Sequence, residues 1–399
     1  MNDIERYIRD NIGKTIKCKA GMKPFTVPCI SETYTDFYYW DTYFTDFALL
    51  RLGDYAQVEN NLGNMKGFLD TLGYVPNSDI TINRSQPPLF ARAVYDYYLV
   101  RGENEQIARR YLPAIVKEHA FWMKERLLPC GLNGYKHNAD GEYLDSFCSD
   151  IEKRVGCEGA YADRLRQGAH FLAIAESGWD FTPRFYSANN RYAGMDYAPV
   201  DLNAILYNME EIAARFALAT GDTALADGFT AYAAARKTLM LQYMTGEHGL
   251  LFDYNAAEGH ISRLYHAGMF APFALGVPCG KEGAEELLAR LELDCGIAAC
   301  ESRADVKFDQ WDYPSMWPPL VYFCAEGLEK AGLHEHAVRI ARKYCSAVED
   351  VFEKTGTLWE KYDARTGTVA ENAEYTTPPM LGWTAGVYCY LIKKYKNEE

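Results

Sequence analysis

The stretch Leu202-Asn203-Ala204-Ile205-Leu206-Tyr207-Asn208-Met209-Glu210-Glu211-Ile212 decides the fold class. Its apolar residues recur at intervals of three and four positions, and the pattern continues to Phe216. This spacing places them on one face of an α-helix, and that face must pack against another element to leave water. The same period returns between Val338 and Val351. The chain is therefore expected to consist of amphipathic helices.

Similar helical segments follow one another along the whole sequence. They occupy approximately residues 41–53, 54–72, 87–100, 104–127, 222–244, 281–293, 314–330 and 380–394. Short breakers containing glycine separate them, for example Leu52-Gly53-Asp54 and Thr220-Gly221-Asp222. This rhythm of helical hairpins predicts a single all-α domain, residues 1–399, in which the hairpins close into a ring. The alternative is an open α-solenoid that binds a partner on its concave face.

Long polar and aromatic loops separate some of the hairpins. They cover residues 14–38, 73–86, 128–160, 177–200, 294–313 and 357–379. Loops of this length within a compact chain usually carry function. In a closed ring of hairpins, we expect them to gather at one rim.

Composition and charge exclude several classes of protein. A net charge of −14 argues against nucleic acid and anionic membrane surfaces as partners, because both require a basic footprint. No run approaches the ~18 consecutive apolar residues of a membrane span. Aromatic residues reach 14%, and the flat faces and polar handles of the 30 tyrosines and 7 tryptophans suit carbohydrate.

The cysteines and the first residues bear on localisation. The 11 cysteines are scattered, without a Cys-x-x-Cys pair or zinc-type spacing, so no metal site is expected. Met1-Asn2-Asp3-Ile4-Glu5 lacks the basic and apolar regions of a signal peptide. We therefore expect reduced thiols in a cytoplasmic protein. The sequence does not determine the oligomeric state.

A short turn at Glu176-Ser177-Gly178-Trp179-Asp180 is the first candidate for a functional site. Ser177 and Gly178 should end the preceding helix, and Pro183 should prevent it from resuming. Trp179 and Asp180 are thereby held just past a rigid element, which suits a catalytic acid beside a sugar-stacking ring. For this turn taken by itself, a helix-terminus loop in which Asp180 is a cap is the simpler interpretation.

Two further Trp-Asp pairs stand at loop-to-helix junctions, Trp40-Asp41 and Trp311-Asp312. Asp41 precedes a helix within a dense aromatic cluster, where it is either a helix cap or a ligand for sugar hydroxyls. Burial of apolar surface would not place an ionised neighbour beside tryptophan each time. Three such pairs therefore indicate a site more than packing.

Polar side chains gather in two other loops. Asn77 and Asn83-Arg84-Ser85-Gln86 offer the donors and acceptors that a polyhydroxylated ligand needs. Phosphate is a poorer fit, because Arg84 is the only cation of that loop and no glycine-rich cradle precedes it. Leu358-Trp359-Glu360-Lys361-Tyr362-Asp363 is expected to be extended, with Glu360 as a second carboxylate opposite Asp180. In the simpler interpretation of this segment, Lys361 pairs with Asp363 or Glu360 at the surface.

Taken in order, these motifs resemble the trehalase family, which are inverting glycoside hydrolases with an (α/α)6 barrel. Tyr39-Trp40-Asp41, Val200-Asp201-Leu202-Asn203, Gln310-Trp311-Asp312-Tyr313-Pro314, Glu360-Lys361-Tyr362-Asp363 and Gly382-Trp383 also take part, so the resemblance covers most of the chain. It implies that Asp180 is the general acid and Glu360 the general base. It implies a sugar pocket lined by Trp40, Asp41, Asn77, Arg84, Gln86, Trp179, Trp311, Asp312, Glu374 and Trp383, and it requires no cofactor.

The mechanism that the resemblance implies makes physical demands on the two carboxyls. One must be protonated and the other ionised, about 6.5–9.5 Å apart so that a water fits between them. Asp180 would need a raised pKa, which burial beside Trp179 and neighbouring carboxylates can supply.

Two arginine-bearing pieces of the family pattern are altered here. The family carries Gly-Gly-Arg-Phe before its first Trp-Asp, where this chain has Ile30-Ser31-Glu32-Thr33-Tyr34. A second piece, Arg-Pro-Glu-Ser-Tyr in the family, reads Arg154-Val155-Gly156-Cys157-Glu158. The resemblance implies trehalose as the default substrate. Because neither serine nor threonine replaces the two hydrogen bonds of an arginine fork, another α-glucoside or a glycosylglycerate is the alternative.

Two other function classes remain open at this point. A sugar isomerase or epimerase on a similar barrel would be expected to use histidine as its base, yet the eight histidines fall outside the Trp-Asp motifs. A non-catalytic helical scaffold would explain the helices but not two carboxylates in polar and aromatic surroundings.

Overall fold

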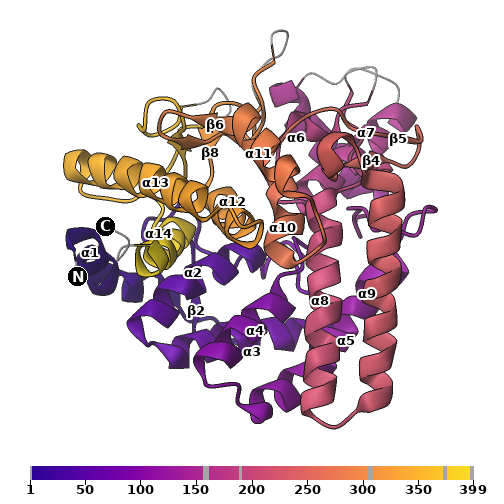
Figure 1. Cartoon of the computed structure of the whole chain (residues 1–399), viewed down its shortest axis with the longest axis horizontal. Coiled ribbons are helices and arrows are strands. Elements are labelled where there is room, and N and C mark those ends of the chain that lie inside the picture. The colour runs from indigo at the N-terminus through magenta and orange to yellow at the C-terminus, as the bar shows by residue number, and fades with distance from the viewer. Residues whose placement is uncertain (1, 156–160, 188–190, 304–308, 372–374, 396–399) are drawn as a thin grey trace.

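Six helices form a closed inner ring in the computed structural model, which describes residues 2–155, 161–187, 191–303, 309–371 and 375–395. The ring consists of α2 (Tyr39–Leu52), α4 (Phe90–Val100), α8 (Val200–Ala219), α10 (Ala271–Leu275), α12 (Pro318–Lys330) and α14 (Gly382–Tyr395). Each packs against the next, and α14 returns to pack on α2, so the ring closes between the first and the last of its helices (Figure 1). The closure excludes an open solenoid.

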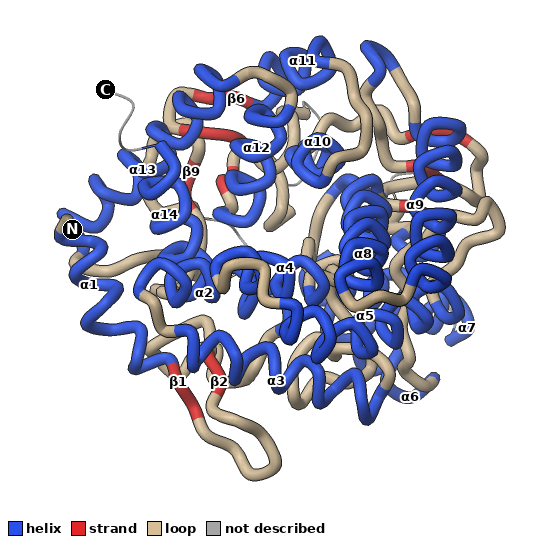
Figure 2. The backbone as a smooth tube through the Cα atoms, turned by 60° about the horizontal axis from the view of Figure 1, so that its bottom comes forward, coloured by secondary structure: helices blue, strands red, loops and turns tan. Residues whose placement is uncertain are grey.

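A second set of helices lies outside this ring. It comprises α3 (Tyr55–Leu72), α5 (Glu105–Glu125), α9 (Thr223–Met244), α11 (Lys281–Leu291) and α13 (His334–Thr355). These pack against ring helices or against the turns that lead into them. The tube in Figure 2 shows α8 and α9 side by side as one such inner and outer pair. The arrangement confirms the predicted (α/α)6 barrel.

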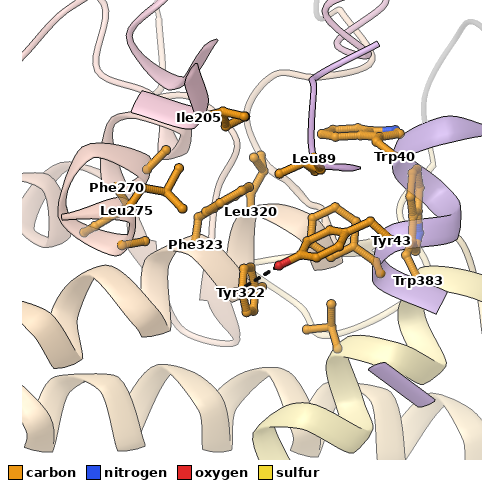
Figure 3. Close-up of a cluster of buried hydrophobic side chains, with 14 of the residues drawn as sticks. Trp40, Tyr43, Leu89, Ile205, Phe270, Leu275, Leu320, Tyr322, Phe323 and Trp383 are labelled. Atoms are coloured by element: carbon orange, nitrogen blue, oxygen red, sulfur yellow. Dashed lines mark hydrogen bonds between the residues drawn. The ribbon is translucent and has the colours of Figure 1, made fainter. Parts of the chain in front are cut away.

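The interior of the ring is apolar and rich in aromatic side chains. Trp40 and Tyr43 from α2 lie close to Tyr322 from α12 and Trp383 from α14 (Figure 3). The hydroxyls of Tyr43 and Tyr322, both buried, lie 3.2 Å apart as a hydrogen bond across the ring. Residues from several turns of the chain thus share one core, which fixes the ring helices relative to one another.

Helix boundaries follow the sequence signals in most places. α12 begins at Pro318, four residues later than the predicted segment 314–330, because proline is tolerated in the first helical turn. The predicted loop 128–160 was wrong in part, since α6 (Gly141–Val155) lies within it and pairs with α7 (Tyr161–Glu176). Leu144, Cys148 and Ile151 do repeat at helical spacing in α6, but polar neighbours conceal the pattern.

The remaining elements are short. Helix α1 (Asp3–Asn11) was not predicted, and it precedes the antiparallel pair β1 (Ile16–Lys17) and β2 (Phe25–Thr26). The three-stranded set is β3 (Tyr197–Ala198), β4 (Tyr254–Asn255) and β5 (His260–Ile261), and β6 (Glu292–Leu293) pairs with β7 (Gly296–Ile297). The pair that matters for the site is β8 (Ser315–Met316) with β9 (Tyr362–Asp363), because it joins two of the long loops.

Candidate active site

A cavity of about 480 Å³ brings residues from widely separated loops together. Among its walls are nine of the side chains that the sequence proposes for a site: Trp40, Asp41, Asn77, Arg84, Gln86, Asp180, Trp311, Glu360 and Trp383. They come from the start of α2, the loop before α4, the turn after α7, the loop before α12, the segment before β9 and the start of α14. The long loops therefore converge on one site.

Asp180 stands on the turn that follows α7. Gly178 adopts a positive φ of 77°, and a Cβ at this position would lie 3.0 Å from the Trp40 ring. Glycine is therefore required both by the backbone conformation and by the close approach of the tryptophan. The Ser177 hydroxyl accepts a hydrogen bond from the Trp179 backbone N–H, 3.1 Å away, and this tightens the turn. Asp180 itself is half-buried in the cavity wall.

A buried charged cluster anchors this turn from below. The guanidinium of Arg184 lies 4.5 Å from the centre of the Trp179 ring and binds Asp201 and Asp253 at 2.8–2.9 Å. His266 approaches Asp253 at 3.1 Å. Burial opposes ionisation of Asp253, but Arg184 and His266 outweigh burial and lower the pKa of Asp253. The anchor is therefore charged, and it holds the backbone that presents Asp180.

Glu360 lies on the opposite loop and is almost fully buried, with 3% of its surface exposed. Its backbone carbonyl accepts a 2.8 Å hydrogen bond from the indole N–H of Trp383. Its carboxylate accepts a 2.6 Å hydrogen bond from the Tyr375 hydroxyl and lies 3.4 Å from the ammonium group of Lys361. Burial raises the pKa of Glu360, while Lys361, Tyr375 and Tyr34 draw it back down. Lys361 is fully buried, so the surface ion pair considered for it is wrong.

Tryptophan rings form one wall of the site. Trp311 stacks on Trp317 with ring centroids 3.7 Å apart and lies 5.5 Å from the Trp40 ring. Trp383 meets Trp40 edge to face at 6.0 Å. The backbone N–H of Trp311 also donates to the carbonyl of Phe181, which joins this wall to the turn of Asp180. Flat indole faces beside paired carboxyls are suited to a sugar ring.

The loop of Arg84 is fixed by two sets of bonds. The Asn77 N–H donates to the carbonyl of Arg84, and the side-chain carbonyl of Gln86 accepts from the N–H of Trp40 at the start of α2. Glu176 accepts the N–H of Ser85 at 2.8 Å and both nitrogens of the Arg126 fork at 2.8 Å. Gln86 thus caps a helix and also lines the cavity, while Glu176 supports the loop from behind.

The charges in the cavity interact strongly. Asp41 is 7% exposed, and burial, then Glu360 and Asp180, raise the pKa of Asp41 to about 8. At neutral pH Asp41 is therefore largely protonated and offers a hydrogen-bond donor to the cavity. Asp41, Asp180 and Glu360 all line this one cavity, so their charges act on the same small volume.

Three predicted residues do not lie in the described cavity wall. Trp179 stands behind it, stacked on Trp311 at 5.3 Å and over Arg184. Asp312 is buried and accepts hydrogen bonds from Arg303 and from the N–H of Tyr313, so its contacts are with the protein. Trp-Asp pairs therefore include packing contacts, contrary to the sequence-based expectation. Glu374 lies outside the described residues.

Several cavity residues were not predicted as site residues. They include Tyr34, Tyr38, Gln310, Trp317 and Tyr375. Gln310 and Tyr375 stand directly beside motif residues, so their neighbours could have indicated them. Tyr34 carries no such signal, because only the fold brings it to Glu360. Within the described residues, no group of three or more His, Cys, Asp and Glu side chains is arranged as a metal site.

Sequence comparison relates the chain to known proteins. The Trehalase family model matches residues 4–396. A periplasmic trehalase of Pseudomonas aeruginosa is 32% identical over 397 residues, covering 94% of this chain and 71% of the relative. A periplasmic trehalase of Citrobacter koseri is 30% identical, covering 93% and 68% respectively.

Solved structures agree on the fold. A neutral trehalase from Saccharomyces cerevisiae superposes with a TM-score of 0.76 at 23% identity, covering 94% of this chain and 74% of that one. A GH63 mannosylglycerate hydrolase from Thermus thermophilus gives a TM-score of 0.68 at 16% identity, covering 97% and 99%.

The expectation of a cytoplasmic protein is contradicted by the two bacterial relatives, which are periplasmic trehalases. The inference of a reducing compartment from the cysteines was wrong for a physical reason. Cys324 and Cys345 are buried in helices, where a thiol is a small apolar packing group and says little about the redox compartment. No helix among the described residues is long and apolar enough to cross a membrane.

The match from residue 4 to residue 396, the identity to two trehalases and the barrel that carries the motifs agree with one another. This chain belongs to the trehalase family and is a glycoside hydrolase.

Proposed function

We propose that the protein hydrolyses the α-glucosidic bond of trehalose with inversion, and that Asp180 and Glu360 are its catalytic acid and base. The observation that carries the proposal is that both carboxyls line one cavity whose wall is built of tryptophans. In the reaction, Glu360 removes a proton from a water whose oxygen bonds to the anomeric carbon. The bond from that carbon to the leaving oxygen breaks, and Asp180 donates its proton to that oxygen.

Unpaired polar atoms in the cavity favour a ligand with many hydroxyls. The side-chain carbonyl of Gln310 and Nε of Arg84 are buried, and neither has a hydrogen-bond partner among the described residues. A buried acceptor or donor left unpaired costs about 1–3 kcal/mol, so a bound sugar hydroxyl that pairs with it contributes to affinity and selectivity. Protonated Asp41 adds a further donor to the same cavity.

The lining of the cavity carries little net charge to repel or attract a substrate. Its described residues include three carboxyls, Asp41, Asp180 and Glu360, and one cation, Arg84. Because Asp41 is largely protonated and Asp180 holds the proton that it donates, the ionised carboxylate of Glu360 is balanced by Arg84. Trehalose is therefore proposed on the similarity to the two trehalases, and a glycosylglycerate stays the alternative, since Thr33 and Tyr34 lie in the wall where the family pattern has its arginine.

The isomerase alternative is disfavoured by the same lining. No histidine is among the described residues that line the cavity, and a proton-abstracting imidazole is what such chemistry usually uses. His266 is near the site, but it is buried behind Trp179 and approaches Asp253.

The proposal extends to the domain organisation. Buried residues from Ile4 to Tyr395 belong to one connected core, which supports a single catalytic domain across residues 1–399.

The test combines two variants with a substrate panel. Asp180→Asn and Glu360→Gln should each lower kcat by at least ~10²-fold while leaving the unfolding midpoint close to that of the native protein. Trehalose, maltose, kojibiose, nigerose, isomaltose, sucrose, glucosylglycerate and mannosylglycerate should be compared by released product. Preferred cleavage of a glycosylglycerate, or near-native turnover in either variant, would reject the corresponding part of the proposal.

A further inference from the structure

Two tyrosine hydroxyls approach Glu360 from different loops. Tyr375 donates to Oε2 at 2.6 Å, and Tyr34 donates to Oε1 at 3.4 Å. Each carboxylate oxygen therefore accepts a hydrogen bond from a different tyrosine. Tyr34 precedes Glu360 by 326 positions in the sequence, and Tyr375 follows it by 15. Such an arrangement fixes the rotation of a carboxylate group about its terminal bond.

The hydrogen bonds around Tyr375 run in a defined direction. The side-chain amide of Gln310 donates to the Tyr375 oxygen, and the Tyr375 hydroxyl proton is directed to Glu360. Since a phenol has one proton to give, Tyr375 can donate to Glu360 only if its other contacts are accepted bonds. Gln310, which is 5% exposed, thus donates the first hydrogen bond of a series that ends on the Glu360 carboxylate.

The surroundings of Glu360 affect its pKa in opposite directions. The ammonium group of Lys361, the next residue in the chain, lies 3.4 Å from the Glu360 carboxylate. It also lies over the Trp317 and Tyr375 rings, 4.5 and 4.3 Å from their centres. Asp41 faces Glu360 from the start of α2, and Cys29 from the segment after β2. The negative charges of Glu360 and Asp180 both raise the pKa of Asp41 and the pKa of Tyr34. Burial raises the pKa of Glu360 and so disfavours its ionised form, whereas hydrogen bonds donated to its carboxylate favour that form.

We infer that Tyr34 and Tyr375 are positioning residues that orient the Glu360 carboxylate toward the attacking water and keep it ionised, with Gln310 fixing Tyr375. This inference rests on the proposed role of Glu360 as the base. It adds residues that act through Glu360 and that need not touch the substrate. Tyr34 lies in the segment where the family's Gly-Gly-Arg-Phe piece is altered in this chain.

The pH dependence of kcat/KM tests the inference with variants that each remove one hydroxyl. The acidic limb of the profile reports the base in the free enzyme. A hydroxyl that donates to a carboxylate stabilises its ionised form, so its loss must move the limb to higher pH. Tyr375→Phe should shift the limb upward by about one pH unit and lower kcat by about tenfold. Tyr34→Phe, with its longer contact, should shift it by a few tenths of a unit in the same direction.

A matched control is available in Tyr97→Phe. Tyr97 is buried and donates a 2.5 Å hydrogen bond to Glu59, remote from the cavity lining, so this variant loses a tyrosine–carboxylate bond of the same kind. Its acidic limb should coincide with that of the native enzyme. A purely structural role of Tyr375 would lower the unfolding midpoint, as in Tyr97→Phe, without moving the limb.

The outcomes separate the two proposals. If Glu360→Gln retains activity, the assignment of the base fails. If Glu360→Gln is inactive but the limbs of Tyr34→Phe and Tyr375→Phe coincide with the native limb, the positioning role is overturned. Should Tyr375→Phe fail to fold, Gln310→Leu takes its place, because the loss of its donor also loosens Tyr375. An upward shift in Gln310→Leu and Tyr34→Phe supports the inference, and unshifted limbs in both reject it.

Discussion

Arg184 and Asp201 form a two-point ion pair, in which each terminal nitrogen of the guanidinium lies 2.8 Å from one carboxylate oxygen. The other edge of Arg184 engages Asp253, and its flat face lies on the Trp179 ring. A buried charged cluster thus supports the turn that presents Asp180. Placing the acid on so rigid a support preserves its geometry through the reaction.

Replacing Arg184 with methionine should destabilise the fold strongly. The variant leaves two buried carboxylates without their cation, which costs about 3–5 kcal/mol in the free energy of unfolding. Urea denaturation provides the measurement. Arg290→Met is the control, because Arg290 pairs with Glu286 within one helix at the surface, and its urea midpoint should stay close to that of the native protein. Equal losses in the two variants would contradict the anchoring role.

The same cluster predicts how stability depends on acid. The pKa of Asp253 is lower in the folded protein than the value of about 3.9 expected in the unfolded chain. The stability it contributes is therefore fully present above about pH 4 and is lost as the pH falls below that value. Unfolding free energies measured between pH 3 and pH 6 should fall steeply at the acid end in the native protein. In Asp253→Asn the unfolding free energy should fall less steeply with decreasing pH, because the contribution of Asp253 is missing.

Asp41 predicts the opposite dependence. Its folded pKa of about 8 exceeds the unfolded value of about 3.9, so the folded state retains a proton that the unfolded chain releases between these limits. The contribution of Asp41 to stability therefore declines as the pH rises from about 4 to about 8. Asp41→Asn cannot ionise and should gain stability relative to the native protein at pH 8 compared with pH 4. An identical difference at the two pH values would show that Asp41 is not perturbed.

Glu176→Gln tests the support of the Arg84 loop. The substitution leaves Arg126 buried without its carboxylate, so we expect a loss of about 3–5 kcal/mol and a raised KM. Glu118→Gln is the matched control, because burial raises the pKa of Glu118 to about 8 and a neutral amide resembles its protonated form at pH 7. That variant should lose no more than about 1 kcal/mol. The comparison needs only chemical denaturation and initial rates.

Periodicity sufficed to predict the long helices of both the ring and the outer set, because their apolar faces extend over several turns. The Ile205 and Met209 face of α8 and the Val338 and Val351 face of α13 are buried as expected. α6 and the five-residue α10 were missed, since short or polar helices owe their stability to neighbours that a local pattern does not reveal.

Site residues could be predicted where they belong to a short motif of neighbouring polar and aromatic residues. Asp180 and Glu360 stand in distinctive motifs, and both line the cavity. Residue type could not separate Trp311, which lines the wall, from Trp179, which supports it, because both are buried indoles followed by aspartate. Tyr34 could not be found either, since its closeness to Glu360 across 326 positions is created only by closure of the ring.

The stereochemistry of the first products tests the central claim most directly. When trehalose is cleaved with inversion, the attacked glucose emerges as the β-anomer and the leaving glucose retains the α-configuration. Proton NMR of the reaction, recorded before mutarotation, should therefore show the two anomers appearing in equal amounts from the first spectrum. Initial release of α-glucose without the matching β-anomer would contradict an inverting reaction by Asp180 and Glu360.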